Sequence, residues 1–163
     1  MMDGTRRSFD LEAIRADFPI LSREVHGKPL VYLDSAASAQ KPAQVLDALM
    51  SAYQDTYANV HRGLHFLSEA STDLYEAVRG KVAGFIGAAS GDEIVLTSGA
   101  TMSLNLIARC WAQPRLQPGD EILISIAEHH ANIVPWQMVA EATGARVRAF
   151  TLEDDGAFSM ARL

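Results

Sequence analysis

The residues best suited to chemistry form one short polar group: Glu128, His129, His130 and Asn132. The group follows the apolar run 121–126, which predicts a short buried strand, and precedes a helical pattern over 135–143. In open α/β sheets, ligands bind beyond the carboxyl ends of the strands. The spacing therefore predicts a ligand site where this strand passes into the helix. From the residues alone, a purely structural role for either histidine stays open.

A second candidate is the turn Thr97–Thr101, which is expected to join a strand over 93–96 to a helix over 102–111. Free backbone N–H groups and the positive end of the helix dipole make such a turn an anion site. It lacks the spacing of a Walker motif or a dinucleotide fingerprint. The alternative is simple N-capping by Ser98 or Thr101, and the residues alone leave both open.

Other reactive groups give weaker signals. His61 and His65 are four residues apart, but Gly63 lies between them and a partner glutamate is missing, so we predict no metal site. Cys110 falls in the apolar helix pattern and is expected to serve packing. The lysines fall in a turn or on helix surfaces, where none is suited to Schiff-base chemistry; they are Lys28, Lys41 and Lys81.

Strand and helix patterns alternate along the chain. Strands are predicted over 30–33, 93–96, 121–126 and 147–150, and helices over 11–16, 42–59, 68–86, 102–111 and 135–143. This alternation favours an α/β fold with a mainly parallel sheet. The helix over 102–111 is apolar nearly all round and should be buried. Residues 1–9 are expected to be disordered and 10–30 to form an N-terminal segment. Residues 31–163 should form the first part of a larger domain, because the last residues resemble the start of a helix.

Composition limits the partners and the compartment. The net charge of −6 and the absence of a basic stripe exclude nucleic acid as an expected partner. A single cysteine permits no internal disulfide, which fits a reducing compartment. The stretch Thr5–Phe9 superficially resembles a twin-arginine signal, but charged residues follow at once, so we expect no export. No apolar run is long enough to cross a membrane. A cytoplasmic protein is expected.

Several of these stretches together resemble one family. They are Ala16–Leu21, Tyr32–Pro42, His61–Gly63 and Glu128–Trp136. They resemble the N-terminal part of group II cysteine desulfurases of the sulfur-mobilisation type, in the class V aminotransferase superfamily. The resemblance implies a fold-type I large domain (three αβα layers, mainly parallel sheet), here incomplete. It also implies pyridoxal 5'-phosphate as cofactor and conversion of L-cysteine to L-alanine, with sulfur carried as a persulfide to an acceptor protein for iron–sulfur cluster assembly. Homodimers are implied when the chain is full length.

The resemblance also implies roles for single residues. His129 would stack on the pyridine ring and take part in proton transfer, with His130 as a structural neighbour. Ala100 and Thr101 would hold the 5'-phosphate. Ala36 and Ala37 would line the substrate pocket, and His61 would lie near its mouth, contributed across a dimer interface.

The sequence departs from the family in three ways. Many relatives have a threonine at the position of Ala100 and an acidic residue at that of Met102. Loss of one charge-assisted phosphate hydrogen bond costs about 1–3 kcal/mol. The family's Schiff-base lysine, ring-pairing aspartate, persulfide cysteine and substrate-binding arginine all lie further along the chain. We therefore expect a fragment that is inactive alone, with exposed sheet edges that favour aggregation. Alternatives are a selenocysteine lyase, a cysteine sulfinate desulfinase, a kynureninase-like hydrolase, or a non-catalytic truncated relative.

Overall fold

A computed structural model describes residues 9–153 and 155–157. The chain divides into two compact units, which meet in sequence between Ile94 and Val95. The disorder expected for 1–9 falls, apart from Phe9, outside the described residues, and so does the helix start expected at the C-terminal end. The three-part division expected from the sequence stays a prediction.

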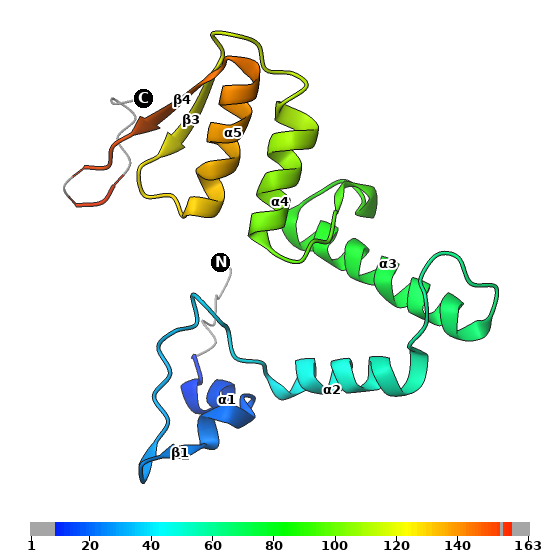
Figure 1. Cartoon of the computed structure of the whole chain (residues 1–163). Helices are drawn as coiled ribbons and strands as arrows, with labels where there is room; N and C mark the ends of the chain where they lie inside the picture. Colours follow the sequence, from blue (N-terminus) through cyan, green and yellow to red (C-terminus); the bar gives the residue numbers. More distant parts are fainter. Residues whose placement is uncertain (1–8, 154, 158–163) are drawn as a thin grey trace, which may run out of the picture. The chain divides into compact units, whose positions relative to one another are not determined.

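The first unit is mostly helical (Figure 1). Its elements are α1 (Leu11–Ala16), the 3-10 helix η1 (Pro19–Ser22), β1 (Glu24–Val25), β2 (Lys28–Pro29), α2 (Ala43–Ser51), the π-helical turn η2 (Ala52–Thr56), α3 (Phe66–Ile86) and the 3-10 helix η3 (Gly91–Glu93). The carboxylate of Asp10 caps α1 by accepting the N–H of Ala13 at 3.0 Å, as its position before the helix predicts. β1 and β2 form a small antiparallel hairpin.

Of the two long helical regions in the first unit, one ends where the sequence predicts and the other is shorter than predicted. α3 ends where the sequence predicts, because Gly87 adopts the left-handed conformation (φ 75°) and returns its N–H to Ala83. The helix predicted over 42–59 is shorter. After α2 and η2 the backbone becomes extended at Tyr57 (ψ 112°), so the helical region ends at Thr56.

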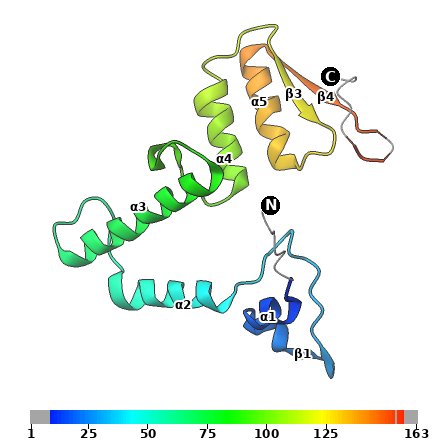
Figure 2. The ribbon, with the colours of Figure 1, turned by 180° about the vertical axis from the view of Figure 1, so that it is seen from behind.

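The second unit contains the parallel strands. Its elements are α4 (Ala100–Leu106), the π-helical segment η4 (Ile107–Ala112), β3 (Glu121–Ser125), the 3-10 helix η5 (His130–Asn132), α5 (Val134–Thr143) and β4 (Arg146–Phe150). β3 and β4 pair in parallel, with Glu121 opposite Arg146 and Ser125 opposite Phe150. α5 connects them, and Figure 2 shows it lying against the pair. The two strands and the helix predicted here are confirmed.

The core of the second unit is built from small and branched side chains on three elements. α5 packs against both η4 and β4. The buried apolar residues there are Ala108, Ala112, Ile124, Val139, Ala140 and Ala145. Alanines on facing sides of η4 and α5 allow close approach of the two helical backbones. This packing fixes the end of β3 and the start of α5, between which the polar group lies.

Three expectations about the elements are wrong. Residues 30–33 and 94–96 form no regular strand, and 91–93 form the turn η3 instead. A strand needs a neighbouring ladder for its N–H and C=O groups, and in the described residues neither segment has one. The helix around Trp111 is also not buried: Trp111 is 61% exposed and Cys110 is exposed. Only the side carrying Ala108 and Ala112 is covered.

Across the described residues, every helix is too short or too polar to pass through a bilayer. The same part of the chain holds no group of three or more His, Cys, Asp or Glu side chains arranged to bind a metal ion.

Candidate functional site

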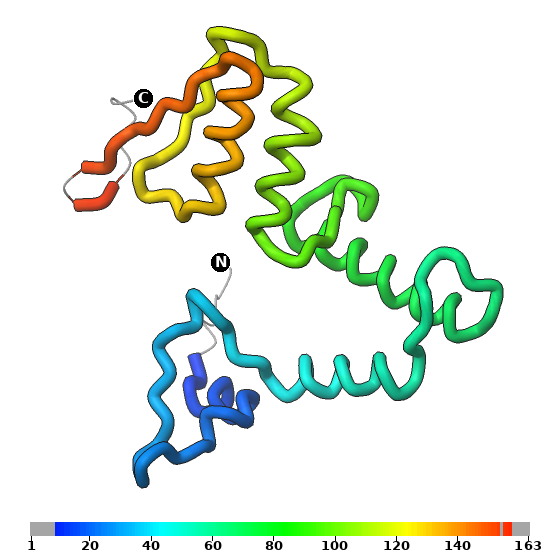
Figure 3. The backbone as a smooth tube through the Cα atoms, in the orientation of Figure 1, coloured from blue at the N-terminus to red at the C-terminus, as the bar shows by residue number. Residues whose placement is uncertain are grey.

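The turn between β3 and α5 is organised by hydrogen bonds between side chains (Figure 3 shows its path). Glu128 accepts at both carboxylate oxygens, from the Ser125 hydroxyl at 2.9 Å and from Nδ2 of Asn132 at 2.8 Å. These two bonds lower the pKa of Glu128, with Asn132 the larger cause, because they stabilise the ionised carboxylate. Trp136 in turn donates its indole N–H to Oδ1 of Asn132 at 2.8 Å.

His129 stands at the N-cap of η5 with its side chain exposed. Its Nδ1 accepts the N–H of Ala131 at 3.1 Å, and its carbonyl accepts the N–H of Asn132 at 2.8 Å. In a neutral imidazole that accepts at Nδ1, the hydrogen is on Nε2. The ring of His130 lies edge-on to it, with centroids 6.2 Å apart. His129 therefore presents an exposed ring held at one nitrogen.

The first turn of α4 forms the second candidate site. The N-cap is Gly99, and no side chain caps the helix. Ser98 directs its hydroxyl to the sulfur of Met102 at 3.4 Å, and Thr97 pairs with Ser103 at 2.7 Å. Simple capping by Ser98 or Thr101 is therefore not what the structure contains. The first N–H groups of a helix have no intrahelical partner, so an anion fits this end. α4 contacts η5, so the structure brings the two candidate sites of this unit together.

The segment with Ala36 and Ala37 lies in the first unit as an exposed turn. The carbonyl of Asp34 accepts the N–H groups of Ala37 and Ser38 at 3.2 and 3.1 Å. The hydroxyl of Tyr32 donates to the carbonyl of Ser38 at 2.5 Å, which closes the turn from the other side. A cavity of about 420 Å³ adjoins the turn, but Ala36 and Ala37 are not among the residues that line it.

His61 has an unusual backbone for a non-glycine residue, with φ 67°. Three residues of α3 contact it: its N–H bonds to Oγ1 of Thr72 at 2.9 Å, its Nε2 lies 2.7 Å from Oε1 of Glu76, and its ring meets that of Tyr75 edge-on. The bond to His61 is the largest cause of the lowered pKa of Glu76, and Arg79, 2.7 Å away, adds to it.

The rest of this loop is tied to α3 by a buried hydroxyl. Ser68 is 1% exposed, donates to the carbonyl of Asn59 at 2.6 Å and accepts the N–H of Gly63 at 3.0 Å. A Cβ atom on Gly63 would lie 2.2 Å from that hydroxyl oxygen, so only glycine fits. The sequence interpretation missed Ser68, Thr72 and Glu76. Their signal was a polar stripe at intervals of four residues on a predicted helix.

The residues present fit a phosphorylated aromatic cofactor in part. The second unit combines an exposed, fixed imidazole with an uncapped helix start. All three lysines of the chain belong to the first unit, where Lys41 donates to the carbonyl of Ala39. The second unit therefore has an exposed imidazole and a helix start without a side-chain cap, but no lysine amine.

Comparison with known proteins identifies the family of the chain. Residues 31–163 match the family model described as aminotransferase class-V. The cysteine desulfurase of Pectobacterium atrosepticum is 54% identical over 156 residues, which is 96% of this chain and 38% of the relative. That of Serratia proteamaculans is 53% identical over the same shares. The chain belongs to the aminotransferase class-V family. It spans about 38% of the length of these curated relatives.

Solved structures agree on the fold. The apo structure of a cysteine desulfurase from Thermococcus onnurineus superposes with a TM-score of 0.85 at 33% identity, covering 96% of this chain and 37% of that one. The cysteine desulfurase CsdA of Escherichia coli gives 0.72 at 45% identity, covering 91% and 36%. The fold is therefore the α/β fold of fold-type I enzymes, of which this chain forms an incomplete part.

Proposed function

We propose that the protein containing this chain is a pyridoxal-phosphate-dependent cysteine desulfurase, which converts L-cysteine to L-alanine and retains the sulfur as a persulfide. The observation that carries the proposal is the contact between α4, with its uncapped start, and η5, with the exposed ring of His129 at its N-cap. The identity of 54% to a cysteine desulfurase over 96% of the chain supports it.

The proposal assigns a task to each site residue. His129 stacks on the cofactor ring and offers Nε2–H for proton transfer, because Nδ1 is engaged by Ala131. Backbone N–H groups at Ala100 and Thr101, with the Thr101 hydroxyl, bind the 5'-phosphate. When bound, pyridoxal phosphate supplies an electron sink for carbanion chemistry.

The remaining assignments concern the substrate. Ala36 and Ala37 leave room for cysteine beside an exposed turn. His61, with its ring fixed by Glu76, lies at the mouth of the site of a homodimer. The sulfur then passes to an acceptor protein for iron–sulfur cluster assembly, in the cytoplasm. Selenocysteine is the competing substrate.

The experiment uses the full reading frame that contains this chain, purified with pyridoxal phosphate. With L-cysteine and a thiol reductant, alanine and sulfide should form in equal amounts. With L-selenocysteine, faster alanine formation would identify a selenocysteine lyase instead. Complete absence of alanine with both substrates would overturn the proposal. The 163-residue chain alone should form no alanine, since the resemblance assigns the Schiff-base lysine and the persulfide cysteine to positions outside these 163 residues.

The phosphate assignment has its own test in the same protein. Thr101→Ala should weaken binding of pyridoxal phosphate about tenfold, which corresponds to one charge-assisted hydrogen bond. Binding of unphosphorylated pyridoxal should not change. Thr143→Ala is the matched control, because Thr143 bonds to the carbonyl of Val139 near the far end of α5. Equal losses for both cofactor forms would contradict the assignment.

A further inference from the structure

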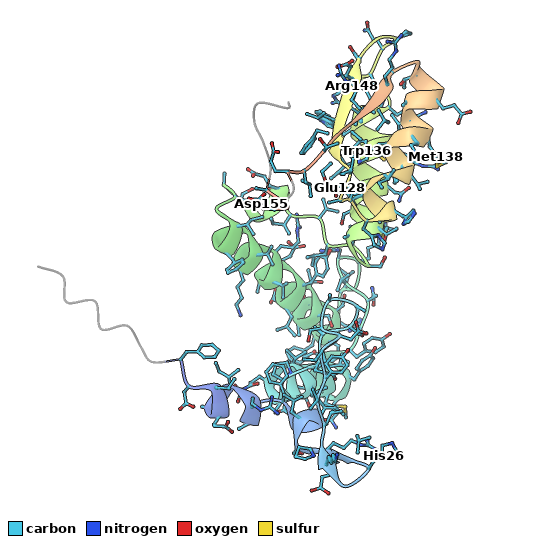
Figure 4. All side chains as sticks on the ribbon, turned by 90° about the vertical axis from the view of Figure 1, so that its left-hand side faces the viewer. His26, Glu128, Trp136, Met138, Arg148 and Asp155 are labelled. Atoms are coloured by element: carbon cyan, nitrogen blue, oxygen red, sulfur yellow. The ribbon has the colours of Figure 1, made fainter. Side chains whose placement is uncertain are left out.

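Three residues spaced four apart form a continuous hydrogen-bonded chain across the turn after β3. Trp136 on α5 donates to Asn132 at the end of η5, and Asn132 donates to Glu128 before η5, each at 2.8 Å. Ser125, 4% exposed at the end of β3, donates to the same carboxylate. Figure 4 labels Glu128 and Trp136, which mark the two ends of the three-residue chain.

The direction of every bond follows from the indole. Tryptophan can only donate, so the atom of Asn132 that faces Trp136 must be its oxygen. The amide NH₂ of Asn132 then faces Glu128, whose carboxylate must accept. Both Glu128 oxygens are thereby engaged, and the pKa of Glu128 is lowered accordingly. The amide of Asn132 therefore has one orientation, fixed by the indole donor on one side and by the carboxylate acceptor on the other.

Capping of α5 does not explain this arrangement. The N-cap of α5 is Ile133, and the helix has no side-chain cap. The side-chain hydrogen bonds of the three residues all go to other side chains and not to the free N–H groups of the helix. The bond between Glu128 and Asn132 spans the segment 129–131. We call the bond between Glu128 and Asn132 the clasp: it joins the residues on either side of the segment that carries His129, whose exposed ring accepts the N–H of Ala131 within that segment.

We propose that Glu128, Asn132 and Trp136 are positioning residues for His129, with Trp136 tying the chain to α5 from outside the turn. This rests on the proposed role of His129 as the ring contact of the cofactor. Loss of the indole donor removes the bond that ties Asn132 to α5, while the carboxylate of Glu128 still orients the amide. Without that tie, Asn132 and the turn that it closes move more freely, and the hydrogen bond between the His129 ring and Ala131 is held less firmly.

The test uses Trp136→Phe in the full protein, which removes the donor and keeps an aromatic ring. Nitrogen-15 spectra of labelled histidine, recorded without cofactor, report which nitrogen of His129 carries hydrogen. The wild type should show one dominant form with hydrogen on Nε2. Trp136→Phe should show a mixture of forms. With the cofactor bound, kcat for alanine formation should fall about tenfold to a hundredfold, since small displacements of reacting groups have effects of that size, while KM for cysteine changes little.

Tyr53→Phe is the control, because it also removes one polar group and keeps the ring, and Tyr53 is exposed in the first unit, where its ring meets that of Tyr57. It should leave the His129 spectrum and kcat unchanged. Glu128→Ala is the second variant: it removes both acceptor oxygens at the other end of the chain and should give the same His129 mixture. The proposal is overturned if Trp136→Phe keeps a single His129 form and a kcat within twofold of wild type. A wild type without desulfurase activity would defeat the proposed function alone, since the spectra still report the clasp.

Discussion

Each unit of the chain has three side chains spaced four residues apart, on or beside a helix and close in sequence or space to a histidine, and the two groups differ in how far along the chain their partners lie. In the first unit, Ser68, Thr72 and Glu76 of α3 extend to a loop that precedes them, at Asn59, His61 and Gly63. In the second unit, Glu128, Asn132 and Trp136 bond to one another and span only the turn they belong to.

The histidines of the two regions also differ in backbone conformation. His129 has an ordinary extended conformation (φ −67°, ψ 148°), so its turn needs little help to form. His61 has φ 67°, a region in which non-glycine residues are uncommon and which costs energy unless the surroundings enforce it. The His61 loop therefore depends on docking to α3, whereas the His129 turn is stabilised locally. Substitutions at the contact between α3 and residues 59–63 should therefore destabilise the His61 loop more than the His129 turn.

Gly63→Ala should have the largest effect of the changes that separate the two regions. Its Cβ would overlap the oxygen of Ser68, and neither the backbone nor the buried hydroxyl can move away freely. Overpacking of this kind costs about 1–3 kcal/mol. Chemical denaturation of the protein should show that loss. Amide hydrogen exchange should show faster exchange in 59–63 and unchanged exchange in 128–132.

Gly84→Ala is the control, since a Cβ at Gly84 meets nothing within 4 Å and the residue lies inside α3. Alanine there should stabilise the protein by about 0.5–1 kcal/mol. If Gly63→Ala instead behaved like Gly84→Ala, the loop would not be docked on Ser68.

Removing a buried serine hydroxyl, in one variant for each unit, should have the next largest effect on stability. Ser68→Ala removes one donor and one acceptor and leaves two backbone groups of the loop without partners, which costs about 2 kcal/mol. Ser125→Ala removes a single bond to Glu128, whose other oxygen keeps Asn132, and costs about 1 kcal/mol. Thermal denaturation of both variants should rank them in this order. A larger loss for Ser125→Ala would reverse the comparison.

The same contrast explains what could be predicted from the sequence. The strand before Glu128, the helix after it and the polar group between them are local patterns, and all three are present in the structure. Even the clasp had a local signal in its spacing of four. The docking of the 59–63 loop had only part of a signal: the polar stripe of Ser68, Thr72 and Glu76 lies on a predicted helix, but nothing local indicates its partners, which lie up to 15 positions away.

The missed strands have a related cause. Residues 30–33 have a strand-like sequence, but a strand is defined by a neighbour, and no periodicity specifies where the neighbour lies. The predicted burial of the helix around Trp111 is wrong for the same reason, since an apolar helix is buried only where another element covers it. The predictions that Ala36 and Ala37 line the substrate pocket and that Ala100 binds phosphate depended on resemblance, because alanine has no chemistry of its own to detect.

The smallest expected effect is on how stability changes with pH in acid, where one glutamate from each region can be compared. The pKa values of both Glu76 and Glu128 in the folded protein lie below the ordinary value of 4.5, the first mainly through His61 and the second mainly through Asn132. A lowered folded pKa contributes stability that is present above pH 4.5 and is lost as pH falls through the folded value. Glu76→Gln and Glu128→Gln should therefore each reduce the loss of stability on acidification in that window.

The partners of the two carboxylates predict how salt separates them. Glu76 faces the imidazole of His61 and the cation Arg79, whereas Glu128 faces the neutral donors Ser125 and Asn132. Salt screens charge pairs more than neutral hydrogen bonds. Raising the salt concentration should shrink the difference between wild type and Glu76→Gln at neutral pH but leave that for Glu128→Gln nearly constant. Equal salt responses would mean that the two carboxylates are held by the same kind of force, and that the regions differ in reach alone.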